Sequence, residues 1–265
     1  MSTAGEAFQK GDIQGAIAAA TAAVRASPRE PGLRWLMAEM LLFAGDTERA
    51  DRALDAVVQE QPSPAVLEFR KLLRAEEARK QCFVEGRVPK FQGEDPTPAQ
   101  RAALQALTHL RFGDAAAAVA ATTEAETARA RTPGQAGSER FDDLRDADDV
   151  LAPILEVLTN AGEYMWVPFE RLRSLTFEEA KRPRDLYWRK CVLELKDGTE
   201  GHVFVPVTYP WAKADTPAPL RLGRETDWIE GDGGPVRGVG QRVWLAGESA
   251  LPITEATTIQ FDETR

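Results

Sequence analysis

A repeat of 34 residues constrains the fold of this chain more than any other feature of its sequence. Residues 11–28 read GDIQGAIAAATAAVRASP, and residues 45–62 read GDTERADRALDAVVQEQP. The two segments share these pairs of residues: Gly11 and Gly45, Asp12 and Asp46, Ala16 and Ala50, Val24 and Val58, Pro28 and Pro62. A period of 34 residues is that of the tetratricopeptide repeat, a helix–turn–helix unit that stacks on its neighbours.

The shared residues suit the ends of helices. Glycine adopts the left-handed conformation that ends one helix, and the aspartate after it caps the start of the next helix. The small alanine allows two helices to approach closely, and the proline closes the second helix of each unit.

A third copy of the repeat follows after an irregular interval. Gly113 opens GDAAAAVAATTEAE and lies 68 residues after Gly45, which is twice the period. Between them, residues 66–86 predict one long helix and residues 87–98 predict a loop. We therefore predict three repeat-like units over residues 3–130.

Such a stack forms a curved surface that binds a peptide or a helix. Trp35, Glu39 and Phe43 fall on the first helix of the second unit, where repeats of this kind line their inner groove. We expect these three side chains to contact a partner. The alternative is that Trp35 and Phe43 belong to the core.

Charge and composition exclude several classes of function. The net charge is −9 at pH 7 and no run of basic residues is present, whereas binding to nucleic acid needs clustered lysine and arginine. No segment approaches the ~20 apolar residues of a membrane helix, and the first residues lack the pattern of a signal peptide. We expect a cytoplasmic protein without nucleic-acid or membrane partners, in which Cys82 and Cys191 are reduced thiols.

The second half of the chain changes to β-type patterning. We predict a short helix over residues 149–160, DVLAPILEVLTN, and then several strands. Asp197-Gly198 is a strong hairpin signal between two alternating segments, and QRVWLAGE is a further strand. The predicted fold class is α+β: a helical repeat domain over residues 1–135, then a smaller, mainly antiparallel β domain with one or two helices over residues 138–265.

The glycine-rich stretch GGPVRGVGQR, residues 233–242, does not match a nucleotide-binding motif. No lysine follows the glycines as a P-loop requires, and the third glycine of a dinucleotide fingerprint is replaced by Val243 at the start of a strand. We interpret the stretch as a tight connection entering that strand, and expect Arg237 and Arg242 to pair either with acidic residues or with a partner.

The remaining reactive residues form no recognisable catalytic set. His109 and His202 are far apart, no G-x-S-x-G motif occurs, and the acidic run Asp142–Asp149 is more typical of a solvated face than of a metal site. We predict no catalytic residues, no cofactor and no metal.

Taken together, the chain resembles the ImpE family, also called TagJ, of bacterial type VI secretion accessory proteins. The resemblance is carried by these segments: LRWLMAEMLLFAGDTERADRALD (33–55), LAPILEVLTNAGEYMWVPFERLRSLTFE (151–178), RDLYWRKCVLELKDGTEGHVFVPVTYP (184–210), LRLGRETDW (220–228) and GGPVRGVGQRVWL (233–245). It implies a non-enzymatic adaptor that binds the N-terminal helical region of the small contractile-sheath subunit, with a connection to the ClpV disassembly ATPase. The binding surface is either the repeat groove or the β-domain surface near Trp166, Phe169 and Trp228.

Two alternatives stay open. One is a generic repeat scaffold or cochaperone unrelated to secretion. The other is an enzyme whose site in the β domain uses Arg221, Arg224, Asp227 and Arg237, because RLGRETDW brings ionisable groups close together as a phosphate or carboxylate pocket would.

Overall fold

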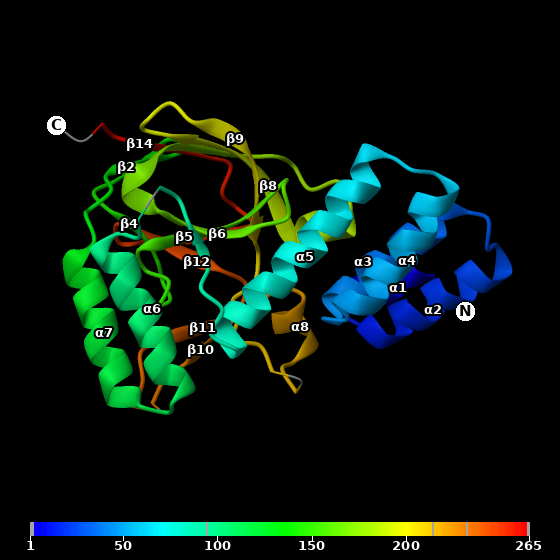
Figure 1. Cartoon of the computed structure of the whole chain (residues 1–265), viewed down its shortest axis with the longest axis horizontal. Helices are drawn as coiled ribbons and strands as arrows, with labels where there is room; N and C mark the ends of the chain where they lie inside the picture. The colour runs from blue at the N-terminus through cyan, green and yellow to red at the C-terminus, as the bar shows by residue number, and fades with distance from the viewer. Residues whose placement is uncertain (1–2, 94, 214, 232, 264–265) are drawn as a thin grey trace.

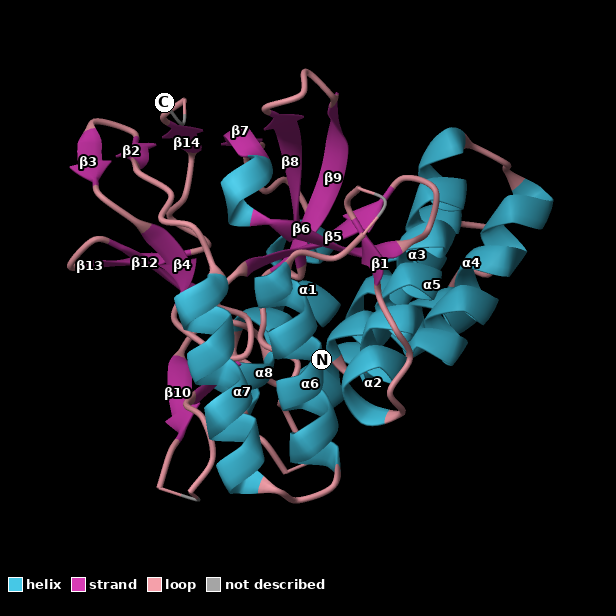
Figure 2. Ribbon diagram, turned by 60° about the vertical axis from the view of Figure 1, so that its left-hand side comes forward, coloured by secondary structure: helices cyan, strands magenta, loops and turns pink. Residues whose placement is uncertain are grey.

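The computed structural model describes residues 3–93, 95–213, 215–231 and 233–263. Its N-terminal part consists of helices that pack in sequence order, with the long helix α5 lying between the earlier helices and the sheet (Figure 1). The helices of this part are α1 (Ala4–Gln9), α2 (Ile13–Ala26), α3 (Pro31–Phe43), α4 (Thr47–Glu60) and α5 (Pro64–Val84). The third repeat pair follows as α6 (Pro98–Arg111) and α7 (Ala115–Ala128), which lie side by side (Figure 2).

The predicted helix ends are confirmed at all three copies of the repeat. Gly11, Gly45 and Gly113 have φ angles of 82°, 78° and 73°, the left-handed region that glycine adopts without strain. The amide of the residue after each glycine donates to a carbonyl of the helix that is ending, at 2.9–3.0 Å, which is the Schellman arrangement. The aspartate in that position then caps the next helix, as Asp12 does by accepting from the amide of Gly15 at 2.7 Å.

The C-terminal part is built on a mainly antiparallel sheet. Within the described residues, one sheet has nine strands in the order β1-β6-β5-β9-β8-β7-β14-β2-β3, a second has β13-β12-β4, and β10 pairs with β11. The strands of the large sheet are β1 (Lys90–Phe91), β2 (Gly134–Ala136), β3 (Glu139–Phe141), β5 (Ile154–Thr159), β6 (Tyr164–Pro168), β7 (Leu172–Phe177), β8 (Trp188–Leu195), β9 (Glu200–Pro206) and β14 (Thr258–Phe261). The others are β4 (Leu144–Asp146), β10 (Thr226–Ile229), β11 (Arg237–Gly240), β12 (Val243–Ala246) and β13 (Ser249–Pro252), and a short helix, α8 (Ala218–Arg221), precedes β10.

The α+β fold class is therefore confirmed, as are the hairpin and the strand near the C-terminus. Gly198 at the β8–β9 turn has φ 87°, as the Asp-Gly pair predicts. QRVWLAGE contains β12. No described helix is long and apolar enough to cross a membrane.

The prediction of a short helix for residues 149–160 is wrong, because this segment contains strand β5. Its apolar side chains are buried on both faces of the sheet: Ile154 packs in a cluster with α5 and α6, whereas Leu155 and Val157 pack in the cluster on the opposite face. A strand buried on both faces has no polar alternation, so its sequence resembles that of a buried helix.

The hydrophobic core is continuous across the two halves of the chain. One cluster joins the first repeats to the sheet through Trp188, Phe204 and Leu222. Another joins α5 and α6 to Trp166 and Tyr209. The predicted boundary between the two domains, at residues 135–138, falls at strand β2 (Gly134–Ala136). The division of the chain into two domains stays a prediction.

Candidate functional site

The face of α3 that was predicted to receive a partner is covered by the chain itself. Residues 178–187, here called the strap, connect β7 to β8 and contain a short 3-10 helix, Pro183–Leu186, that contacts α3. The guanidinium carbons of Arg182 and Arg184 lie 5.4 and 5.5 Å from the centre of the Trp35 ring. Tyr187 meets Phe43 edge to face, with ring centres 5.3 Å apart. The strap thus covers this face of α3 with cationic and aromatic side chains.

Glu39 lies under the strap with only 3% of its surface exposed. Its carboxylate accepts from the indole N–H of Trp35 at 3.3 Å. Burial raises the pKa of Glu39 to about 7, against the opposing effect of Arg184 and Arg182. The strap therefore rests on a carboxyl group that changes charge near neutral pH.

We expect Glu39→Gln to change how stability depends on pH. Because the pKa of Glu39 is raised from 4.5 to about 7 on folding, the folded chain holds its proton more tightly and is stabilised by it below pH 4.5. That contribution is lost as pH rises from 4.5 to 7, at most on the order of 3 kcal/mol. Urea unfolding from pH 4 to 8 should show this fall in the parent chain and a smaller fall in the variant. Identical pH profiles of the two proteins would contradict the assignment.

The other predicted partner residues lie on other elements than the strap and α3, and Trp166 and Trp228 belong to one hydrophobic cluster. Trp166 is fully buried and donates to the hydroxyl of Tyr164 at 2.6 Å. Phe169 is 3% exposed and packs against Trp244. Trp228 is half-buried on β10, and the centre of its ring lies 6.0 Å from the centre of the Tyr209 ring.

Of the six predicted residues, the structure groups Trp35, Glu39 and Phe43 on α3 and places the others on other elements. Trp35 and Trp228 are half-buried, whereas the other four side chains expose little surface in this conformation. Their role in binding a partner stays a prediction.

The arginines of RLGRETDW bind helix ends. Arg224 donates to the carbonyls of Gln9 and Phe8 at 2.9 and 2.8 Å, at the end of α1. Arg221 donates to the carbonyl of Ala44 at 3.0 Å, just after α3. Carbonyls at a helix C-terminus lack partners within the helix and carry partial negative charge. These two arginines therefore fasten the repeats to the C-terminal half.

The other two residues of the enzyme hypothesis lie on paired strands. Asp227 is on β10, where its side chain accepts from the amide of Trp228 at 2.8 Å. Arg237 is on β11, with its guanidinium 5.8 Å from the centre of the Trp211 ring.

A buried ionic network links α5 to the sheet. The sequence predicts that Arg242 pairs with acidic residues or with a partner, but it identifies neither those residues nor Arg79. Arg242 is fully buried and pairs with Asp146 at 2.6 Å and also with Glu156. On the other side, Arg79 of α5 donates to Glu156 at 2.8 Å and to Glu76 at 3.3 Å. Burial opposes ionisation of Glu156, but the two guanidinium groups lower its pKa to about 2. The sequence signal was an arginine directly before a strand, whereas Glu76 and Arg79 are two of many charged residues in α5.

The acidic run Asp142–Asp149 supplies hydrogen-bond acceptors to the fold. Asp146 joins the ionic network, and Asp143 pairs with Arg129 at 2.6 Å. Asp148 accepts from the indole of Trp211 at 2.7 Å and from backbone amides. In the parts of the chain that the structure describes, no group of three or more His, Cys, Asp or Glu side chains is placed to hold a metal ion.

The glycine-rich stretch contains strand β11 and the approach to β12. A Cβ atom on Gly238 would lie 2.1 Å from the ring of Tyr209, and one on Gly240 would lie 2.2 Å from the carbonyl oxygen of Glu225. These glycines allow the backbone to pass close to buried neighbours. The stretch is thus a tight packing element that positions Arg242.

The two cysteines are buried, unpaired thiols. Burial raises the pKa of each to about 12, so neither forms a thiolate at neutral pH.

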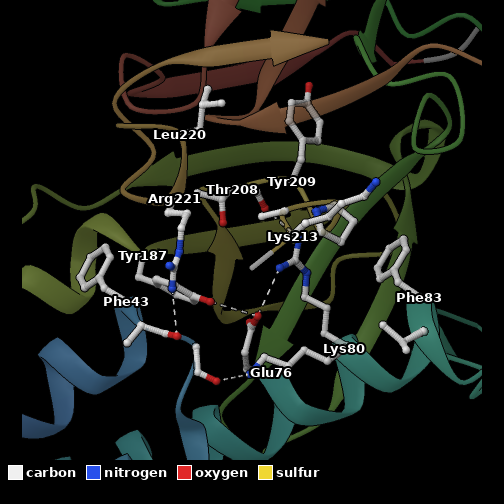
Figure 3. Close-up of a pocket in the computed structure, with 16 residues that line it drawn as sticks. Phe43, Glu76, Lys80, Phe83, Tyr187, Thr208, Tyr209, Lys213, Leu220 and Arg221 are labelled. Carbon is white, nitrogen blue, oxygen red and sulfur yellow. Dashed lines mark hydrogen bonds and ion pairs between the residues drawn. The ribbon is translucent and has the colours of Figure 1, made fainter. Parts of the chain in front are cut away.

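A cleft opens where the end of α3, α5, Tyr187, residues 208–213 and residues 220–221 meet, with a volume of about 350 Å³. Figure 3 shows Glu76 inside it, with Arg221 and Lys80 reaching the chain at the end of α3 from different elements. The cleft is lined by Phe43, Ala44, Gly45, Glu76, Arg79, Lys80, Phe83, Val84, Tyr187, Thr208, Tyr209, Pro210, Ala212, Lys213, Leu220 and Arg221.

Comparison with known proteins agrees with this architecture. A family model described as ImpE protein matches residues 138–260, and a tetratricopeptide-repeat model matches residues 7–73. The chain is 34% identical over 252 residues to the type VI secretion system accessory component TagJ of Pseudomonas aeruginosa, covering 93% of this chain and 87% of that protein. The chain belongs to the ImpE/TagJ family.

A solved structure extends the comparison to three dimensions. The crystal structure of protein VPA1032 from Vibrio parahaemolyticus matches with a TM-score of 0.91 and 28% identity, over 98% of each chain. The joined arrangement of repeats and sheet is therefore shared by this ImpE/TagJ-family chain and that protein.

Proposed function

We propose that this chain is an adaptor of a type VI secretion system that binds the N-terminal helical region of the small contractile-sheath subunit. The observation that carries the proposal is its 34% identity to a TagJ accessory component over nearly the whole chain. Tetratricopeptide-like helices support it, because such stacks bind extended or helical segments of other proteins. We place this activity in the cytoplasm.

The proposed contact lies on α3, and the surface near Trp228 on the β10–β11 pair is the alternative. Trp35 and Trp228 keep part of their surface exposed, and aromatic side chains commonly supply most of the affinity at such interfaces. Glu39 and Phe43 would join the contact only if the strap moves away from α3. A helix that lays its apolar side along α3 would therefore compete with the strap.

The test is co-purification with the small sheath subunit. We expect the full chain to retain that subunit, and to lose it when the subunit's N-terminal helix is deleted. Trp35→Ala is expected to weaken binding by about tenfold, since truncating an interface tryptophan commonly costs about 1–2 kcal/mol or more. Phe112→Ala is a matched control, because Phe112 is 83% exposed at the end of α6 and lies in the third repeat pair.

Unchanged retention after deletion of the helix would contradict the proposed partner. Equal affinity of the Trp35→Ala variant would instead contradict the proposed surface. Circular dichroism of each variant separates a lost contact from a lost fold.

We also propose a connection to the ClpV ATPase through the bound sheath subunit. Because the proposed connection is indirect, we expect ClpV to co-purify with this chain only when the sheath subunit is present. Retention of ClpV without the subunit would show direct contact and contradict this part of the proposal.

A further inference from the structure

The cleft defined above has the size of a small binding site. Its volume of about 350 Å³ lies in the range of small-ligand pockets, roughly 300–1,000 Å³. An α-helix with its side chains is about 10–12 Å wide, so the cleft suits one side chain or a small molecule better than a helix.

Positive charge dominates the rim of the cleft. Lys80, Lys213 and Arg221 line it, and Glu76 is the acidic side chain among the lining residues. Glu76 already accepts from the indole of Trp188 at 2.9 Å and from Arg79 at 3.3 Å. The local excess of cations contrasts with the net charge of −9 of the whole chain.

The rim cations keep donors for a further partner. Lys80 donates to the carbonyl of Gly45 at 2.9 Å and its amine lies 4.0 Å from Glu77, and Arg221 donates to the carbonyl of Ala44 at 3.0 Å. An ammonium has three N–H donors and a guanidinium has five, so both groups keep unused donors. The Lys213 amine makes no hydrogen bond or ion pair with any residue that the structure describes. The rim can therefore offer several charge-assisted hydrogen bonds to one anion.

The walls of the cleft strengthen this attraction. Phe43 and Phe83 are almost fully buried, and Tyr187 closes the inner end beside Glu76. Apolar walls lower the local dielectric and concentrate the field of the cations in the opening.

From this geometry we propose that the cleft binds an anionic group, a carboxylate or a phosphate, through Lys80, Lys213 and Arg221. The site goes beyond the proposed function and does not depend on it. The anion comes either from a free small molecule or from an acidic side chain of a bound partner, and the chemistry at the rim is the same in both cases.

Calorimetric titration of the full chain at low ionic strength tests the site. The probes are inorganic phosphate and succinate, each compared with choline chloride at equal ionic strength. We expect saturable one-site binding of at least one probe and none of chloride. Binding of neither probe would overturn the proposal.

Two variants locate the binding. Lys213→Gln should weaken it by about tenfold, the usual effect of losing one charge-assisted hydrogen bond. Lys213 is exposed, so its replacement leaves the core intact. Lys10→Gln is the matched control, because Lys10 is an exposed lysine at the end of α1, away from the lining residues. Equal weakening by the two variants, or none by Lys213→Gln, would overturn the proposal.

A final arm identifies the source of the anion. The titration is repeated with a peptide of the sheath subunit's N-terminal helix present. Loss of phosphate or succinate binding would assign the site to an acidic group of that partner, and unchanged binding would assign it to a small molecule. Failure of the peptide to bind would count against the proposed function alone, since the first titrations do not use it.

Discussion

Replacing Glu156 with glutamine is expected to lower the free energy of unfolding by about 3 kcal/mol at pH 7. Glu156 is fully buried between Arg79 and Arg242, and these guanidinium groups lower its pKa from 4.5 to about 2. A shift of that size corresponds to about 3 kcal/mol of stability, and removing one partner of a buried ion pair commonly costs about 3–5 kcal/mol. Chemical denaturation monitored by tryptophan fluorescence measures the loss.

The pH dependence of the same variant gives a second check. A lowered pKa contributes stability that is present above pH 4.5 and is lost as pH falls towards 2. The difference in stability between the parent chain and Glu156→Gln should therefore shrink over that window.

Glu163→Gln is the matched control. Glu163 pairs with Lys90 at the surface, where both side chains are well exposed. An exposed pair of this kind contributes at most about 1 kcal/mol. If the two variants lost the same amount of stability, the buried network would not be what joins α5 to the sheet.

Replacing Gly240 with alanine is expected to destabilise the fold by about 3 kcal/mol or more. Gly240 has φ +90°, and its new Cβ atom would lie 2.2 Å from the carbonyl oxygen of Glu225. The left-handed conformation costs about 1 kcal/mol for alanine, and forcing backbone apart in a packed region adds about 1–3 kcal/mol. Thermal and urea unfolding measure the effect.

Gly233→Ala, in the same stretch, separates the two causes. Gly233 has φ +78°, and among the described residues other than its own chain neighbours no atom lies within 4 Å of the place that a new Cβ atom would take. Only the cost of about 1 kcal/mol for its backbone conformation therefore applies. A loss at Gly240 no larger than that at Gly233 would show that the close approach to Glu225 is unimportant.

Local signals in the sequence predicted the helical half well. The Gly-Asp pairs at the start of each repeat specify how one helix ends and the next begins, and those interactions span only a few residues. The hairpin at Asp197-Gly198 follows from the same kind of local preference. The prediction for residues 149–160 was wrong because burial of β5 on both faces depends on distant elements.

The candidate site was less predictable for the same reason. The sequence indicated Trp35, Glu39 and Phe43 as one face of α3, but it gave no sign that the strap would cover that face. It offered the arginines of RLGRETDW as members of an anion-binding pocket. Only the fold shows that Arg221 and Arg224 bind helix ends. The cleft depends on segments that are far apart in the chain: the end of α3, α5, Tyr187 and residues 208–213 with 220–221.

The sequence by itself determined the period of the repeats, the ends of their helices, the change to β structure and the family. Tertiary structure decided which faces are covered and which charges are paired. Arg79 meets Glu156 across 77 residues of chain, and Arg242 meets Asp146 across 96. Capping and turn preferences act between neighbours and can be read from a short segment, whereas burial and ion pairing depend on which distant segments the packed core brings together.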